Sequence, residues 1–266
     1  MDPAVVAEIK TRLGEIERAE DVTIPLAVES GSRAWGFPSS DSDYDCRFIY
    51  VRRLEAAADL FPPRDVIETP LTPVFDVNGW DLAKALRLML KGNAVVLEWL
   101  ASPLAYRRNE AFCAELHNFA ARSFRREAIA NHYLHLLRNQ LARHGGDAER
   151  IPVKKLFYML RPAMALRFLR LNGGERSVPM RLQDLCASSS VAPDLHAEID
   201  VLIAAKQGLA EAVPQSAPAS LMEFILDEER HGTGWAGTEG PLEDCREQAR
   251  NLYVRMIREF GPGASA

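Results

Sequence analysis

Apolar residues recur first at helical spacing and then at strand spacing at the start of the chain. Residues 3–18 place them three or four positions apart, which predicts an amphipathic helix. The following run TIPLAVES, residues 23–30, is β-branched and aliphatic and ends at Gly31-Ser32, so it predicts a strand that leads into a tight turn. The apolar positions of the predicted helix are Val5, Val6, Ile9, Leu13 and Ile16.

A second strand and a third one are predicted after the turn-forming stretch FPSSDSD. Residues 44–51 alternate, with Cys46, Phe48 and Tyr50 on one face and Asp45, Ile49 and Val51 on the other. Residues 71–77 predict a third strand, which we expect to end at Asn78-Gly79. Asp81 is placed to cap a helix over 81–92, and residues 94–102 predict another helix.

From about residue 107 onward the pattern is almost entirely helical. Glycine pairs and two loop-like stretches, at 214–220 and 231–240, separate the predicted helical segments 109–144, 152–172, 194–213 and 241–260. A small head of strands and helices is therefore expected to precede a helical domain, and we place the boundary between residues 1–106 and 107–266.

Composition narrows the class of protein. The chain has 266 residues, of which 47% are hydrophobic and 26% are charged, so disorder, collagen and a disulfide scaffold are excluded. The four cysteines form no CxxC pair, which indicates reduced thiols rather than a zinc site. No apolar run is long enough to span a membrane, and the first residues are acidic where a signal peptide is basic, so we expect a cytoplasmic protein.

Charge is unevenly distributed along the chain, although the net charge is only −5. Residues 121–181 hold 13 Lys and Arg against 4 Asp and Glu, whereas residues 182–266 hold 6 against 14. The basic segment predicts either a surface for a polyanion or a helical face with solvated Arg and Lys.

Closely spaced carboxylates are the clearest candidates for a metal-binding site in the sequence. Asp43 and Asp45 are two positions apart at the start of the second strand. In an extended strand their side chains lie on the same face, about 6.6 Å from each other. Asp76 adds a carboxylate within the apolar run VFDV, where a charge is costly unless it is paired or bound to a cation. Carboxylate oxygens are the ligands that Mg²⁺ prefers, although a solvated acidic turn gives the same sequence pattern.

The motif around these residues resembles a known family. Gly31-Ser32 follows a buried strand, a spacer of ten residues comes next, and Asp43-x-Asp45 enters the following strand. This order is similar to the signature of polymerase-β-like nucleotidyltransferases. The blocks GSRAWGF, SDYDCRFIYV, DVNGWDLAKAL and KKLFYMLRP resemble more narrowly the RlaP group, the RNA-ligase-associated or YcgL-type predicted nucleotidyltransferases.

The resemblance implies an α+β fold, in which a polymerase-β-like head with a small mixed sheet flanked by helices precedes an all-α domain. It also implies transfer of a nucleoside monophosphate from an NTP to an acceptor, with two Mg²⁺ ions, replaceable by Mn²⁺, as cofactors. Carried over by position, Asp43, Asp45 and Asp76 become metal ligands and catalytic residues, and Asp76 accepts the proton of the acceptor hydroxyl. Such a reaction needs alignment and charge neutralisation more than covalent help.

Nucleotide binding is assigned to the Gly-Ser turn and to basic and aromatic residues. A Gly-Ser turn exposes backbone N–H groups that suit phosphate. Lys154, Tyr158 and Arg161 share one helical face, which suits triphosphate and base contacts, although a solvated basic stripe has the same spacing. The predicted nucleotide-binding residues are Gly31, Ser32, Arg33, Lys84, Lys154, Lys155, Tyr158 and Arg161.

The acceptor is expected to be an RNA end, because the group is associated with RNA ligases. Transfer to a protein side chain and a non-catalytic NTP or RNA sensor remain alternatives. A third alternative is a partner protein whose acidic C-terminal third binds a basic surface.

Overall fold

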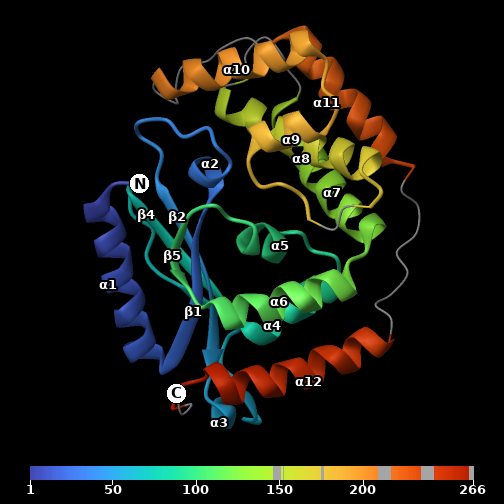
Figure 1. The fold of residues 1–266 in the computed structure, drawn as a ribbon. Coiled ribbons are helices and arrows are strands. Elements are labelled where there is room, and N and C mark those ends of the chain that lie inside the picture. The colour runs from blue at the N-terminus through green and yellow to red at the C-terminus, as the bar shows by residue number, and fades with distance from the viewer. Residues whose placement is uncertain (146–150, 152, 175–176, 209–216, 235–242, 264–266) are drawn as a thin grey trace.

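A five-stranded mixed sheet forms the centre of the N-terminal half (Figure 1). The structure is a computed structural model that describes residues 1–145, 151, 153–174, 177–208, 217–234 and 243–263, with only the backbone of residues 153 and 154. The strand order is β3-β4-β2-β1-β5, in which β2 and β4 are parallel and the other pairs are antiparallel. The strands are β1 (Val22–Ser30), β2 (Tyr44–Arg52), β3 (Val66–Glu68), β4 (Phe75–Asp81) and β5 (Ala105–Arg108).

Helices cover both faces of this sheet. Figure 1 shows α1 along one face, where its buried leucine and isoleucines pack against Phe48 and Tyr50. Helices α4, α5, α6 and α12 pack against the other face, around Ile49 and Val51. The head helices are α1 (Pro3–Glu20), α2 (Gly31–Ala34), α3 (Leu54–Ala57), α4 (Leu82–Leu90), α5 (Val95–Leu100) and α6 (Glu110–Ser123).

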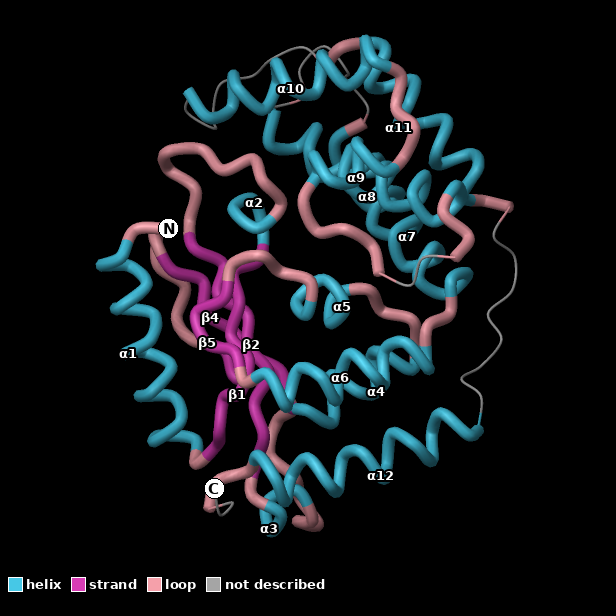
Figure 2. Tube along the Cα trace, viewed as in Figure 1, coloured by secondary structure: helices cyan, strands magenta, loops and turns pink. Residues whose placement is uncertain are grey.

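The rest of the chain is helical and has its own apolar core. Helices α7 to α11 lie together (Figure 2). They surround an apolar cluster to which α8 contributes most of its described side chains, and Phe37 of the head joins this cluster. Helix α12 leaves this group and lies against α4 and α6. These helices are α7 (Arg126–His144), α8 (Val153–Leu171), α9 (Leu182–Ser188), α10 (Pro193–Gly208), α11 (Ala219–Gly232) and α12 (Glu243–Phe260).

The α+β class and the alternation along 44–51 are confirmed. Cys46, Phe48 and Tyr50 face α1, whereas Ile49 and Val51 face the opposite layer. The division at residues 106/107 stays a prediction. The sheet core extends beyond it, because α6 and α12 supply side chains to the cluster around Ile49.

Some predicted boundaries were wrong. Strand β4 runs from Phe75 to Asp81 and therefore continues through Asn78-Gly79, where we expected it to end. A Cβ at Gly79 would lie 2.1 Å from a ring atom of Phe48, so the glycine makes room for that ring within the sheet. The predicted helix 109–144 is two helices, because the backbone of Phe124 and Arg125 is extended. Strands β3 and β5 and helices α2, α3, α9 and α11 were not predicted.

Part of the uneven charge is balanced within the fold, because acidic residues of one segment pair with arginines of another. Glu228 of α11 is 1% exposed and pairs with Arg167 and Arg170 of α8 at 2.9 and 2.6 Å. Glu229 pairs with Arg138 of α7 at 2.6 Å. Acidic residues of the C-terminal third thus neutralise arginines of the basic segment 121–181, which accounts for part of the charge asymmetry in the sequence.

Two further observations concern sequence predictions. All four cysteines are buried and none forms a disulfide. Within the described ranges, no helix combines the length and the apolar character that crossing a lipid bilayer requires.

Candidate active site

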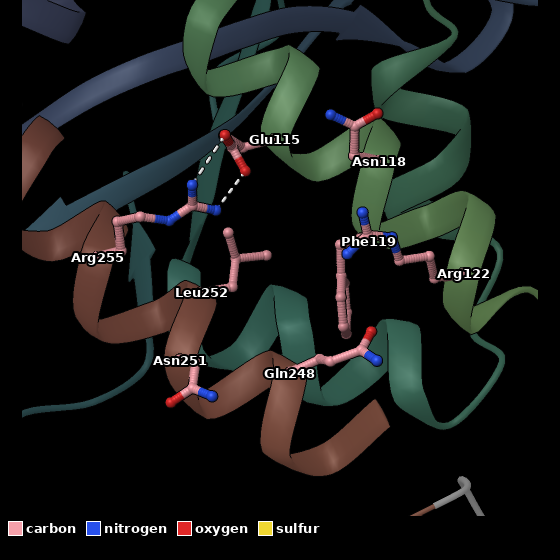
Figure 3. A pocket seen from close by; sticks show the side chains of 8 residues that line it. All are labelled: Glu115, Asn118, Phe119, Arg122, Gln248, Asn251, Leu252 and Arg255. Atoms are coloured by element: carbon pink, nitrogen blue, oxygen red, sulfur yellow. Dashed lines mark hydrogen bonds and ion pairs between the residues drawn. The ribbon is translucent and has the colours of Figure 1, made fainter. Parts of the chain in front are cut away.

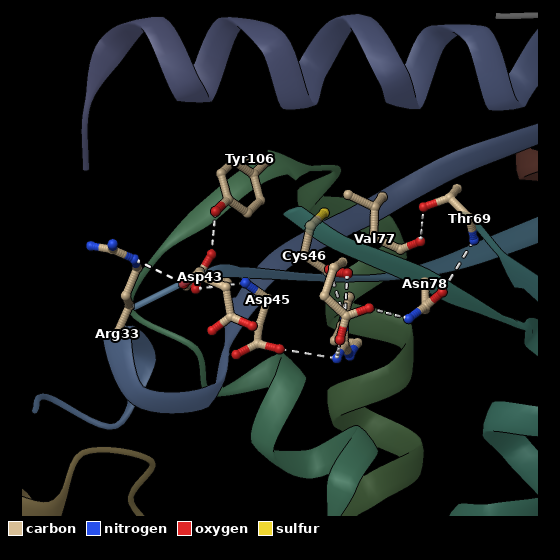
Figure 4. Close-up of polar contacts among 11 residues, drawn as sticks. Arg33, Asp43, Asp45, Cys46, Thr69, Val77, Asn78 and Tyr106 are labelled. Atoms are coloured by element: carbon tan, nitrogen blue, oxygen red, sulfur yellow. Dashed lines mark hydrogen bonds and ion pairs between the residues drawn. The ribbon is translucent and has the colours of Figure 1, made fainter. Parts of the chain in front are cut away.

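Residues Ser30, Asp45 and Asp76 lie on adjacent strands at one end of the sheet. Ser30 of β1 is opposite Asp45 of β2, and Asp45 is opposite Asp76 of β4. Neighbouring strands are about 4.8 Å apart, so this register brings the two carboxylates together. Asp43 precedes β2, and Figure 4 shows its side chain pointing the same way as that of Asp45.

The Gly-Ser turn lies directly against Asp45. Gly31 has a φ of +63°, in the left-handed region that favours glycine, and a Cβ there would lie 2.0 Å from Asp45 Oδ2. Glycine is therefore required both by the backbone and by the closeness of the carboxylate. Ser32 is buried, and its hydroxyl donates to Ser42 Oγ at 3.1 Å, so in this structure it braces the loop that leads to Asp43.

Arg47 links the two aspartates. Its Nη2 donates to Asp45 Oδ1 at 3.1 Å and to Asp76 Oδ2 at 2.5 Å, and its Nη1 donates to the carbonyl oxygen of Asp76 at 2.8 Å. The side-chain amide of Asn78 donates to the other carboxylate oxygen of Asp76. A guanidinium held by two carboxylates in a half-buried place neutralises charges that would otherwise repel each other.

A divalent cation fits this donor set. Asp45 and Asp76 supply the carboxylate oxygens that Mg²⁺ prefers, and Arg47 already places a positive charge between them. Among the residues described, no three His, Cys, Asp or Glu side chains converge into a preformed metal cluster. The metal-binding roles of Asp43, Asp45 and Asp76 therefore stay predictions, in which an ion would take over the neutralising role of Arg47.

A cavity of about 350 Å³ opens between these strand ends and the helical region. The head contributes Gly31, Trp35, Asp45 and Arg47 from the turn and the sheet, and Glu98 from α5. Helices α7 and α8 contribute Leu136, Gln140, Tyr158, Arg161 and Pro162. Four predicted site residues, Gly31, Asp45, Tyr158 and Arg161, thus line one cavity although they lie far apart in the sequence.

The other predicted nucleotide-binding residues have different surroundings. Arg33 donates to the carbonyl oxygens of Ser42 and Asp43 at 2.6 and 3.1 Å, so it holds the loop before β2 (Figure 4). Lys84 lies 3.4 Å from Asp65 and near the ring of Trp80. Lys155 lies 5.6 Å from the ring of Tyr158, and the side chain of Lys154 lies outside the described part of the chain.

Sequence reasoning missed Arg47, Glu98 and Glu29. Arg47 follows Asp45 by two positions on a strand, so the alternation could have placed both on one face. Glu98 is the lone charge in the apolar run AVVLEWLAS, and a buried charge of this kind demands a partner. It finds Arg161, whose Nη1 lies 2.8 Å from Glu98 Oε1.

Glu29 supports the site from the opposite side of the sheet. It is fully buried and accepts two hydrogen bonds, one from the hydroxyl of Tyr106 and one from the backbone N–H of Asp45 at 3.1 Å. Burial raises the pKa of Glu29 to about 7, against the lowering effect of the Tyr106 hydrogen bond. This carboxyl therefore fixes the start of β2 next to Asp45.

A second cavity, of about 460 Å³, lies between α6 and α12 (Figure 3). Its walls are polar, with Asn118, Arg122 and Asn251, and Arg255 forms an ion pair with Glu115 across it. None of the predicted site residues lines it, so the cavity at Asp45 is the better candidate for chemistry.

Comparison with known proteins identifies the family to which the chain is similar. Residues 5–243 match the family described as "RlaP: RNA repair pathway DNA polymerase beta family". The chain is also 38% identical over 260 residues to the "Uncharacterized protein YcgL" of Bacillus subtilis (strain 168), which covers 97% of both chains. The resemblance inferred from the sequence is thereby confirmed. The chain belongs to the RNA repair pathway DNA polymerase beta family.

Proposed function

We propose that this protein is a nucleotidyltransferase that moves a nucleoside monophosphate from an NTP to the hydroxyl of an RNA end. One observation carries the proposal: Asp45 and Asp76 lie in register on adjacent strands, against the Gly31 turn and beside a cavity of about 350 Å³. The family description supports nucleotidyl transfer and an RNA acceptor.

In the proposed reaction, the acceptor oxygen attacks the α-phosphorus of the NTP. The bond between that phosphorus and the oxygen bridging to the β-phosphorus breaks, and pyrophosphate leaves with the electron pair. Asp76 accepts the proton of the acceptor hydroxyl and passes it to solvent. Bound Mg²⁺, held by Asp43, Asp45 and Asp76, would supply neutralisation of the phosphate charge.

Residues around the carboxylates have distinct tasks in this proposal. The backbone N–H groups at Gly31 and Ser32 bind the triphosphate. Arg47, which now bridges Asp45 and Asp76, would contact a phosphate oxygen once released from these carboxylates. Alignment and neutralisation of charge are the main contributions that such a reaction needs.

The test combines NTPs labelled at the α-phosphate, MgCl₂ and an RNA oligonucleotide with a free end. We expect label on the RNA and release of pyrophosphate, both lost in Asp45→Asn and Asp76→Asn. Asp41→Asn is the matched control, because Asp41 is exposed in the same acidic turn. Transfer that survives in Asp45→Asn and Asp76→Asn contradicts the proposal.

The same assay with a total protein extract in place of RNA tests transfer to a protein side chain. NTP binding without pyrophosphate release from any acceptor identifies a sensor instead of an enzyme.

A further inference from the structure

Two residues that line the cavity, Arg161 of α8 and Trp35 of the head, carry buried hydrogen-bond donors with no acceptor among the described residues. Arg161 is 3% exposed, and its Nε and Nη1 donate to the Met180 carbonyl oxygen and to Glu98 Oε1 at 3.1 and 2.8 Å. Its third nitrogen, Nη2, has no partner among the residues described. The indole Nε1 of Trp35 is likewise buried and without a partner. Buried donors of this kind cost free energy unless a ligand supplies the acceptor.

The orientation of these donors is fixed by their surroundings. The guanidinium of Arg161 lies 4.9 Å from the ring centroid of Trp35, and the ring of Tyr158 meets Trp35 edge-on at 5.7 Å. The hydroxyl of Tyr133, which is fully buried, donates to the same oxygen of Glu98 at 2.7 Å. Arg161 and Trp35 are thus held in place by their neighbours.

Charge favours a neutral ligand at this end of the cavity. Glu98 neutralises Arg161, and both side chains are at least nine-tenths buried. The neighbouring wall is apolar, with Val95, Leu136 and Pro162. A phosphate, by contrast, finds its donors at the other end, at the Gly31 turn and Arg47.

The carboxylate adds an acceptor to the two donors. Glu98 Oε1 receives both of the hydrogen bonds described above, whereas Oε2 takes part in none within the described residues. The residues that line this end of the cavity therefore hold two N–H donors and one carboxylate oxygen that could pair with a ligand.

We propose that this end of the cavity selects a nucleobase in which a carbonyl stands beside a ring N–H, namely guanine or uracil. The carbonyl oxygen accepts from Arg161 Nη2 or Trp35 Nε1, and the ring N–H donates to Glu98. Adenine and cytosine carry an amino group in place of that carbonyl, so they would leave a buried donor facing another donor. The inference rests on the proposed function, because it identifies the NTP used at the same site.

Equilibrium binding of GTP, UTP, ATP and CTP in MgCl₂, measured by calorimetry, tests the inference separately from turnover. One unpaired buried donor corresponds to a loss of about 10- to 100-fold in affinity. We expect GTP or UTP to bind tighter than ATP and CTP by that factor, and the difference between GTP and UTP identifies the purine or the pyrimidine. Guanosine and uridine should show the same preference over adenosine and cytidine without the triphosphate.

Trp35→Phe removes the indole donor and keeps an aromatic ring, so it should reduce the preference several-fold. Trp99→Phe is the matched control, because Trp99 is buried against Trp80 outside this cavity. Arg161→Lys provides a second variant that keeps the charge opposite Glu98 but loses the planar fork. Inorganic tripolyphosphate should bind all variants like the wild type.

The outcomes separate the two proposals. Equal affinity for all four NTPs overturns the inference, whether or not pyrophosphate is released. A preference for GTP or UTP without pyrophosphate release from any acceptor supports the inference and overturns the proposed function. Absence of binding by every nucleotide and nucleoside overturns both.

Discussion

Substitution of Gly31 by alanine tests how the close contact between the turn and the Asp45 carboxylate affects the proposed reaction. Gly31 has a φ of +63°, and the added Cβ would lie 2.0 Å from Oδ2 and 2.8 Å from Cγ of Asp45. The left-handed backbone costs a residue with a Cβ about 1–2 kcal/mol. The carboxylate of Asp45 must also move by about 1 Å or more to reach an ordinary van der Waals distance from the methyl group.

The backbone strain and the displacement of the Asp45 carboxylate change two different measured quantities. The free energy of unfolding should decrease by about 1–2 kcal/mol, because only the backbone strain acts on the whole fold. The rate of nucleotidyl transfer should decrease by about 100-fold, since a misplacement of about 1 Å at a reacting centre has that effect. Urea unfolding measures the first quantity, and pyrophosphate release at saturating NTP measures the second.

Gly14→Ala is the matched control for this substitution. Gly14 lies within α1, and a Cβ there would meet no atom within 4 Å. Alanine should stabilise the protein by about 0.5–1 kcal/mol through helix propensity and leave the transfer rate unchanged. Transfer by Gly31→Ala at a rate within twofold of the wild type would refute the role assigned to the turn.

Three further substitutions address stability. Gly79→Ala places a Cβ 2.1 Å from the Phe48 ring, so it should lower the free energy of unfolding by about 1–3 kcal/mol; an unchanged urea midpoint would contradict the packing. Folding raises the pKa of Glu29 from 4.5 to about 7, so the folded state binds more protons than the unfolded state between these pH values. The free energy of unfolding should therefore fall by about 3 kcal/mol as the pH rises from 4.5 through 7. Glu29→Gln should remove this slope in urea unfolding measured across that range, and a retained slope would assign it to another group. Glu228→Gln leaves two arginines of α8 without their buried partner and should cost about 3 kcal/mol by the same assay, whereas a loss below 1 kcal/mol would show that the pairing is not required.

The local sequence pattern predicted the helices and strands whose buried residues recur at regular spacing. Helix α1 and strand β2 lie where the spacing of apolar residues placed them, because α1 buries one regular face and β2 buries alternating residues on its two faces. Strand β4 did not end at Asn78-Gly79, because the reason for Gly79 is the ring of Phe48 on the neighbouring strand. Strand β5 is a four-residue edge strand with two arginines, and only its pairing with β1 defines it.

In the candidate site, too, the local sequence predicted some residues, whereas tertiary packing determines the others. The spacing of Asp43 and Asp45, the lone acid in the run VFDV and the family resemblance together led to the prediction that these carboxylates share a site, and the structure places Asp45 opposite Asp76. Which basic residues face the cavity depends on how α7 and α8 pack against the head, and no local pattern encodes that. Arg33 follows the Gly-Ser turn directly, yet its guanidinium is engaged by carbonyl oxygens of the loop, whereas Arg47 lies between the carboxylates.

Two ion pairs on opposite sides of the cavity differ in how firmly they are held, and this difference fits two tasks. Arg161 and Glu98 are almost fully buried and are fixed by Tyr133 and a backbone carbonyl, so they form a rigid surface for recognition. Arg47 is about 21% exposed and shares one nitrogen between Asp45 and Asp76. A long side chain with access to solvent can leave its partners when a more highly charged ion replaces it. Under the proposed function, the sheet end of the cavity would exchange Arg47 for a cation, and the end formed by Arg161, Trp35 and Glu98 would hold the nucleobase in a fixed position.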